Sequence, residues 1–348
     1  MDDFQKNTSI ESIVLHVVGN KAEEENIKFS KAPLQTSETI QELLLQYFLA
    51  PFKKLEYYHF SHDNDLQFNE VYHHANEIFE NPDSIYDASV KLAKRLYEKS
   101  DHPKIKPGEF YTVYFKNCLV ENKIVDAIGL FKSESKETFL TVYPSGQSFE
   151  IDHEDGININ KLDKGCIIYN LEQENGYLLE VIDNLNKNSD AHYWFDEFLG
   201  VENRKDEYFQ TRQAIQMCKN FVAQKLPEEF ETDKADQAAL LNKSAQYFKE
   251  KENFDFEEYS KEVIEQPEVI SSFNNFKEEY TKEIDDPFPE SFEISEPAVK
   301  KQSKIFKSVI KLDKNFHIYI HGDRSKVQRG YDEESGMHYY QLFYEKEH

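Results

Sequence analysis

Cysteine, methionine, tryptophan and glycine are all scarce in this chain. Its 348 residues include 3 Cys, 3 Met, 1 Trp and 11 Gly. Cys118, Cys166 and Cys218 lie about fifty residues apart and form no CxxC pair. An odd number of widely spaced cysteines disfavours a disulfide framework and is typical of proteins in a reducing compartment.

Motifs that bind nucleotides or carry common hydrolytic chemistry are missing. The sequence has no GxxxxGK[ST] and no GxGxxG, whose glycines let the backbone approach a phosphate group. It also has neither the GxSxG of serine hydrolases nor the HExxH of zinc proteases. We therefore predict no cofactor, no bound metal and no catalytic residues.

Two polar clusters are poorly suited to hold a metal ion. The segment HDNDLQFNE at 62–70 alternates Asp63 and Asp65 but lacks the glycine and the final glutamate of a calcium-binding loop. His73 and His74 are adjacent, and neighbouring residues of a helix point about 100° apart. We expect a solvated turn at the first cluster and no shared ion at the second.

Long apolar runs are absent as well. No segment approaches the roughly 20 apolar residues that span a bilayer. The first residues, MDDFQKNTSIESIV, begin with acids and show no basic-then-apolar signal pattern. We expect a cytoplasmic protein that does not enter a membrane.

Material for hydrophobic cores is nevertheless plentiful. Hydrophobic residues make up 39% of the chain, and 27 Phe and 21 Tyr provide much of the surface that can be buried. A chain of 348 residues exceeds what one core usually organises, so two or three structural units are expected.

The hydrophobic pattern changes twice along the chain. A strand-like run at 10–18 is followed by two helical stretches, and six strand-like runs lie between 109 and 183. The links between these six runs are too short for helical crossovers, which predicts an antiparallel sheet. Residues 190–283 have helical periodicity, and strands return at the end. The predicted fold class is α+β, with an N-terminal antiparallel sheet and helices, a helical middle region and a small C-terminal antiparallel β-meander.

Composition divides the chain into four predicted segments. They are an α+β N-terminal domain at 1–187, a helical region at 188–284, a linker rich in proline and acids at 285–298, and a basic β unit at 299–348. Because prolines lack a backbone donor and dense acids discourage packing, we expect the linker to be a flexible joint.

Several motifs follow one another in an order that matches a known family. They are SIVLH at 12–16, DSIYDASVKLAKRLYEK at 83–99, ININKLDKGCIIYNL at 157–171, WFDEFLG at 194–200, and the tail from FPESF at 288–292 to the DEESG turn. In their order and spacing, over nearly the whole chain, they resemble the bacterial nucleoid-associated NdpA/YejK family. The resemblance implies association with the nucleoid, and it supplies no catalytic residues.

Charge is distributed very unevenly. The chain has a net charge of −25. Residues 250–297 hold sixteen acids and four lysines, a net charge of −12. Residues 299–330 hold two acids and nine basic residues, a net charge of +7. The nine candidate DNA-binding residues are Lys300, Lys301, Lys304, Lys307, Lys311, Lys314, Arg324, Lys326 and Arg329.

These residue types indicate DNA binding without sequence preference. Lysines neutralise phosphates but do not read base edges, and only five arginines are available in the whole chain for bidentate contacts to guanine. We predict a non-enzymatic nucleoid-associated protein whose DNA contact is weak, because the rest of the chain repels DNA.

Other interpretations of the basic segment remain open. Its lysines could blunt the edge of a solvated sheet, or they could dock on the acidic stretch at 250–297. In a second hypothesis the protein is an acidic adaptor for DNA-associated proteins such as topoisomerases. In a third, Asp126, Glu134 and Lys136 form a metal-dependent nuclease site, although ESK at 134–136 is expected in a turn.

Overall fold

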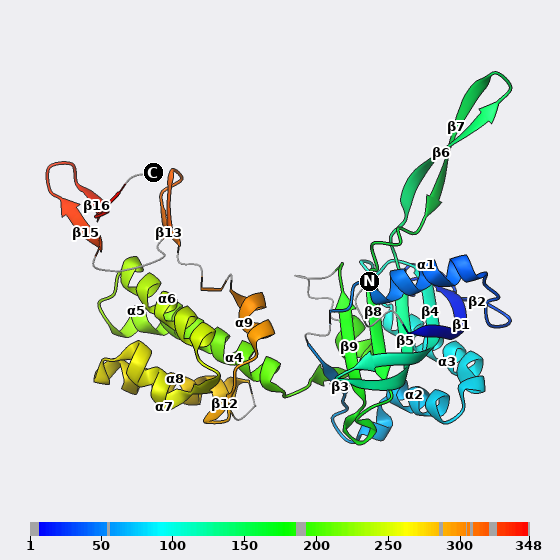
Figure 1. Ribbon diagram of the computed structural model, residues 1–348, viewed down its shortest axis with the longest axis horizontal. Coiled ribbons are helices and arrows are strands. Elements are labelled where there is room, and N and C mark those ends of the chain that lie inside the picture. Colours follow the sequence, from blue (N-terminus) through cyan, green and yellow to red (C-terminus); the bar gives the residue numbers. More distant parts are fainter. Residues whose placement is uncertain are drawn as a thin grey trace. The chain divides into compact units, whose positions relative to one another are not determined.

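The computed structural model describes residues 7–53, 56–185, 193–284, 288–303, 305–306, 309–319 and 326–346. The chain divides into two compact units, Met1–Arg204 and Lys205–His348. The first contains an antiparallel sheet with helices, and the second contains helices and small hairpins (Figure 1). The predicted α+β fold class is confirmed.

The first unit is built around an eight-stranded sheet with the strand order β10-β3-β9-β8-β5-β4-β1-β2. All its pairings are antiparallel. The strands are β1 (Ser9–Val18), β2 (Lys28–Phe29), β3 (Tyr58–Phe60), β4 (Gly108–Val120), β5 (Lys123–Ser133), β8 (Lys164–Tyr169), β9 (Leu178–Asp183) and β10 (Val201–Asn203). Glu121 and Asn122 join β4 to β5 with positive φ at both, as in the type I′ turns that match strand twist.

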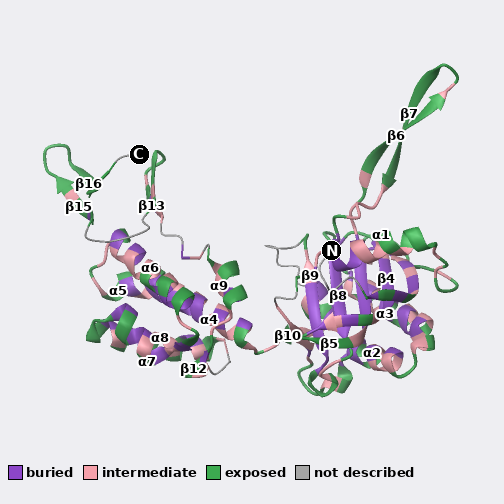
Figure 2. Ribbon diagram, in the orientation of Figure 1, coloured by how far each residue is buried: buried purple, intermediate pink, exposed green. Residues whose placement is uncertain are grey.

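Helical segments cover both faces of this sheet. They are α1 (Glu38–Leu49), α2 (Glu70–Glu80), α3 (Ile85–Lys99) and the π-helical η4 (Tyr193–Leu199). Side chains alternate along each strand, so β4 serves two cores. Its Tyr111, Val113 and Phe115 pack with α1. Its Phe110 and Tyr114 pack in the opposite core with α2, α3 and η4. The central strands β4, β5 and β8, which lie between the two cores, are mostly buried (Figure 2).

Helix α2 lies in a region where the sequence predicted no helix. It begins after Asn69, whose side-chain oxygen accepts hydrogen bonds from the backbone N–H groups of Val71 and Tyr72. The amide nitrogen of Asn69 donates to the carbonyls of Leu199 and Gly200. This one buried residue therefore caps α2 and ties it to the end of η4.

Two of the six predicted strands do not join the sheet. β6 (Glu137–Ser145) and β7 (Ser148–Gly156) pair only with each other, as a separate two-stranded ribbon. The ribbon projects from the sheet and is exposed along most of its length (Figure 2). The prediction of one sheet from all six runs is wrong at these two, because alternation along a strand does not show whether another layer covers it.

The second unit has an aromatic core enclosed by helices. They are α4 (Glu207–Asn220), α5 (Leu226–Glu229), α6 (Lys234–Glu250), α7 (Phe256–Tyr259), α8 (Pro267–Glu283) and α9 (Glu296–Gln302), with π-helical turns η5 (Phe221–Lys225) and η6 (Ser260–Ile264). Phe248 stacks on Phe254 with ring centres 5.0 Å apart, and Phe254 stacks on Phe292 at 5.2 Å. The second unit contains no tryptophan, and these phenylalanine rings fill its core instead.

The predicted linker at 285–298 contains packed structure in its described part. β12 (Ser291–Glu293) pairs with β11 (Asn253–Asp255), and Phe292 is buried. Ala298, in the first turns of α9, is buried as well. Residues 285–287 lie outside the described residues. The division of the chain into four segments stays a prediction.

The C-terminal strands form two hairpins instead of one meander. β13 (Val309–Leu312) pairs with β14 (Phe316–Tyr319), and β15 (Val327–Asp332) pairs with β16 (Met337–Leu342). Each hairpin is a two-stranded sheet of its own. Ile310 and Val327 anchor the hairpins on Ala235 and Ala238 of α6. The small apolar base leaves most other side chains of both hairpins exposed.

His16, a residue of the SIVLH motif, makes the stability of the first unit sensitive to acid. It is buried, and its Nδ1 accepts the backbone N–H of Ser30, so Nε2 carries the proton and donates to Ser89 at 3.0 Å. Burial lowers the pKa of His16 below its ordinary value of 6.5. The unfolded chain therefore gains this proton first as the pH falls, and the native state loses stability below about pH 6.5.

We expect His16→Gln to reduce this pH dependence, because glutamine does not titrate. The test is the midpoint of urea unfolding of parent and variant at several pH values between 5 and 8. The difference between the two midpoints should shrink as the pH falls below 6.5. A difference that stays constant over this range would show that His16 does not contribute.

Candidate nucleic-acid interface

Six of the nine predicted basic residues lie in described parts of the chain, and all six are exposed. Lys300 and Lys301 belong to α9, Lys311 belongs to β13, and Lys314 lies in the turn after it. Lys326 directly precedes β15, and Arg329 belongs to that strand. The other three, Lys304, Lys307 and Arg324, lie outside the described residues.

Two of the six basic side chains are engaged within the second unit. The Nζ of Lys326 lies 3.1 Å from a carboxylate oxygen of Glu345. The Nζ of Lys301 lies 5.7 Å from the ring centre of Tyr208, at cation–π distance. The Lys326–Glu345 pair is exposed on both sides, where an ion pair is weak and exchanges readily for others, whereas Lys301 contacts the buried ring of Tyr208.

The other four are Lys300, Lys311, Lys314 and Arg329. Within the described ranges, no carboxylate lies at ion-pair distance from any of them. Their charge is therefore not neutralised by the described protein surface. Four exposed cations in one stretch of a chain with a net charge of −25 are available to an anionic partner.

The acidic stretch at 250–297 makes its ion pairs with nearby lysines of the helical region. Lys251 lies 2.7 Å from Glu258 and 3.0 Å from Glu262, and Lys277 lies 2.8 Å from Glu290. These pairs join α7, η6, α8 and the adjoining loops to one another. They give part of the acidic charge a partner that is not one of the nine candidate DNA-binding residues.

The sequence model of a family described as nucleoid-associated protein YejK matches residues 14–336. The chain belongs to this family. The resemblance to NdpA/YejK proteins predicted from the motifs is confirmed. A search of curated proteins finds no match.

Among the described residues, no helix is both long enough and apolar enough to cross a bilayer. The three cysteines, Cys118, Cys166 and Cys218, are free and buried. Burial raises the pKa of the Cys218 thiol to about 12, which leaves it unreactive. All three lie outside the basic segment at 299–330.

The hypothetical nuclease triad is dispersed in this member of the YejK family. Asp126 contacts Lys116 at 2.8 Å, whereas Glu134 contacts Lys132 at 3.0 Å. Lys136 pairs with Glu109 instead of either acid. Asp126 lies in β5 and Glu134 directly follows its last residue, so eight residues of extended chain separate the two acids, roughly 26 Å at about 3.3 Å per residue. They cannot bind one metal ion together, so the nuclease hypothesis has no structural support.

The side chains of His73, His74 and Glu77 lie close enough together to bind one metal ion. The Nδ1 of His74 lies 2.8 Å from Glu77, and the Nε2 of His73 lies 3.6 Å from it, so all three could reach one ion. The expectation that the two histidines diverge is wrong, because Glu77 lies one turn beyond both. Lys91 also lies 3.2 Å from Glu77, so this carboxylate already has a counterion.

A buried charged network is the largest feature that sequence reasoning missed. Lys132 of β5 and Lys164 of β8 are directly opposite each other, and both side chains are 0% exposed. Glu134 lies 3.0 Å from Lys132, and Asp183 lies 2.8 Å from Lys164. Tyr193 donates a hydrogen bond to Glu134, and its ring lies within 5.6 Å of both ammonium groups. Each buried lysine thus has its own carboxylate.

Proposed function

We propose that this nucleoid-associated protein binds duplex DNA directly, without sequence preference and without catalysis, through the exposed basic residues of 299–330. The observation that supports the proposal is the set of four exposed cations without a described counterion, Lys300, Lys311, Lys314 and Arg329. The partner is the phosphate backbone, and the role is architectural or regulatory.

The chemistry of these residues favours contact with phosphates over the reading of bases. Three of the four are lysines on flexible stems, which neutralise charge without fixed geometry. Arg329 is the one arginine among them, so bidentate recognition of guanine is limited to a single side chain. Random duplexes should therefore compete as well as any chosen sequence.

Salt should weaken this binding in a predictable way. Neutralising Z phosphates releases counterions, and log affinity falls against log salt with a slope of about −0.9Z on duplex DNA. Four cations predict a slope of roughly −3 to −4. The measurement is fluorescence anisotropy of a labelled random duplex at several salt concentrations. A slope near zero, or strong preference for one sequence, would contradict phosphate binding by this surface.

We expect no turnover of DNA. Asp126 pairs with Lys116 and Glu134 pairs with Lys132, and the two acids lie too far apart along β5 and the residue after it to share a magnesium ion. Supercoiled plasmid incubated with the protein and Mg²⁺ should remain supercoiled. Nicking that requires Mg²⁺ and disappears in Asp126→Ala would overturn this expectation.

A further inference from the structure

The two faces of the β6–β7 ribbon have opposite chemistry. Residues paired across the strands share a face, and the pairs Leu140–His153, Val142–Ile151 and Pro144–Phe149 lie on the same one. Glu150, Asp152 and Glu154 project from the other face, beside Tyr143, Thr141 and Phe139. We call these the apolar face and the acidic face of the ribbon.

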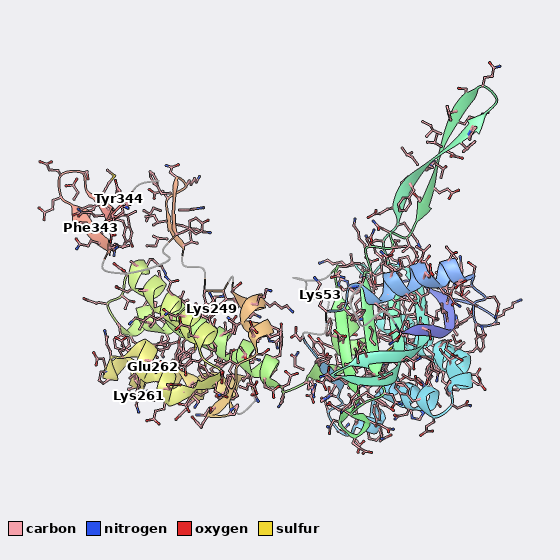
Figure 3. The ribbon with its side chains drawn as sticks, in the orientation of Figure 1. Lys53, Lys249, Lys261, Glu262, Phe343 and Tyr344 are labelled. Carbon is pink, nitrogen blue, oxygen red and sulfur yellow. The ribbon has the colours of Figure 1, made fainter. Side chains whose placement is uncertain are left out.

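The apolar face is open to solvent. Leu140 is 73% exposed, Phe149 71%, Ile151 69% and Val142 61%. Side chains stand out from the ribbon along its whole length (Figure 3). The four apolar side chains and Pro144 together make a patch on the order of 500 Å², as large as the largest apolar patch on a typical monomer. A two-stranded ribbon alone in water is marginally stable, so we expect a second layer to pack on this face and stabilise it.

We propose that this partner is the ribbon of a second copy of the chain, packed face to face and antiparallel in a two-fold dimer. Two such faces would bury roughly 1,000 Å² in total, the area at which a well-packed interface becomes specific. A two-fold axis brings the same patch of both copies together, so a single apolar face can complete itself.

An apolar groove at the base of the ribbon fits the tip of a second ribbon. It has a volume of 160 Å³ and is lined by Ile40, Leu43, Leu44 and Tyr47 of α1, by Tyr111, and by Ile157 and Ile159. A cavity of about 150 Å³ is large enough for one benzene ring. Phe149, near the tip of the ribbon, is the exposed ring that matches it.

The length of the ribbon would bring Phe149 of one copy to the groove of the other. Ile157 directly follows the last residue of β7, whereas Phe149 is the second residue of that strand. Eight residues separate the two, roughly 27 Å in extended chain. When two ribbons overlap fully in antiparallel directions, each Phe149 therefore reaches the level of the groove in the other copy. Within one chain the same distance keeps Phe149 away from its own groove.

The charge pattern allows two copies of an acidic chain to meet here. The ribbon carries Glu137, Glu150, Asp152 and Glu154 on its acidic face, which would point outward in the dimer. On the apolar face the single acid is Asp155, at the base, where its side chain accepts a hydrogen bond from Thr138. Repulsion between the copies is thus smallest across the apolar face.

Sedimentation of the full-length chain tests this dimer. The parent should sediment as a dimer at micromolar concentration, and Leu140→Glu combined with Ile151→Glu should raise its dissociation constant at least tenfold. The matched control is Phe139→Glu combined with Tyr143→Glu on the acidic face, which should remain dimeric. Because the ribbon projects from the sheet, the circular dichroism spectrum should be unchanged in both variants, which would show that both still fold.

A disulfide between copies tests the geometry itself. Phe149→Cys combined with Leu43→Cys should give a covalent dimer on mild oxidation, and either substitution alone should give far less. The three native cysteines are buried and do not compete. A parent that stays monomeric, or a dimer that survives the apolar-face substitutions, would overturn the proposal. So would a doubly substituted chain that forms no covalent dimer.

Discussion

Reversing Lys300, Lys311, Lys314 and Arg329 to glutamate is expected to abolish detectable DNA binding. Each substitution replaces an attraction to phosphate by a repulsion, and the four together change the charge of the surface by eight units. At low salt we expect affinity to fall on the order of a hundredfold or more. The measurement is the anisotropy titration with a random duplex, in the full-length protein.

A matched control separates the local surface from the net charge. Four exposed lysines of the first unit, Lys28, Lys31, Lys104 and Lys123, can be reversed with the same total change of charge. At 0.1 M salt, charges that make no contact with the DNA are screened over about 10 Å, so this control should lose far less affinity there than the first variant if the contact is made by 299–330. Adding Lys304→Glu and Lys307→Glu to the first variant tests two predicted positions outside the described residues.

Two outcomes would move the function elsewhere. If the charge-reversed protein binds DNA as well as the parent at low salt, the contact lies outside these four residues. If neither protein binds DNA, yet both capture a topoisomerase or another basic DNA-associated protein, the adaptor hypothesis explains the association with the nucleoid.

The strands of the first unit were predictable because alternation and turn clusters are local signals. Runs such as EFYTVYFKNCLV and KIVDAIGLFK became β4 and β5, and their tight link became the turn at Glu121 and Asn122. The departure of β6 and β7 from the sheet was not predictable. A strand with one apolar face has the same sequence pattern whether or not a second layer covers that face.

Side-chain partners were the least predictable feature. The sequence indicated Glu134 as a carboxylate in a charged turn, whereas the structure buries it against Lys132. No local pattern pairs two lysines across neighbouring strands, since Lys132 and Lys164 are brought together only by the register of β5 and β8. Helix α2 had a weak signal in Asn69 followed by Glu70, a capping residue ahead of an acid in the first turn.

Glu134→Gln is expected to destabilise the first unit by about 3 kcal/mol or more. Removing one partner of a buried ion pair leaves the other charge unpaired, which typically costs 3–5 kcal/mol. Glutamine keeps the size of the side chain and can still accept the hydrogen bond of Tyr193, so the loss reports charge rather than packing. The measurement is the free energy of urea unfolding at pH 7.

The exposed pair of Lys21 and Glu98 provides the control. Glu98→Gln should cost less than about 1 kcal/mol, because surface ion pairs contribute little. Restoring neutrality in the core by adding Lys132→Met to Glu134→Gln should recover most of the stability lost by the single substitution. Equal losses from Glu134→Gln and Glu98→Gln would show that the buried charge needs no counterion.

The pH dependence of Glu134→Gln provides a test of sign. Burial lowers the pKa of Lys132 below its ordinary value of 10.5, while Glu134 opposes that shift. Without Glu134 the native lysine should lose its proton at a lower pH still, whereas the unfolded chain keeps it up to about pH 10.5. The unfolded state then binds more protons, so the stability of the variant rises with pH in this window. Its deficit relative to the parent should therefore be smaller at pH 9.5 than at pH 7, and a deficit that grows would show that Lys132 is not the destabilising charge.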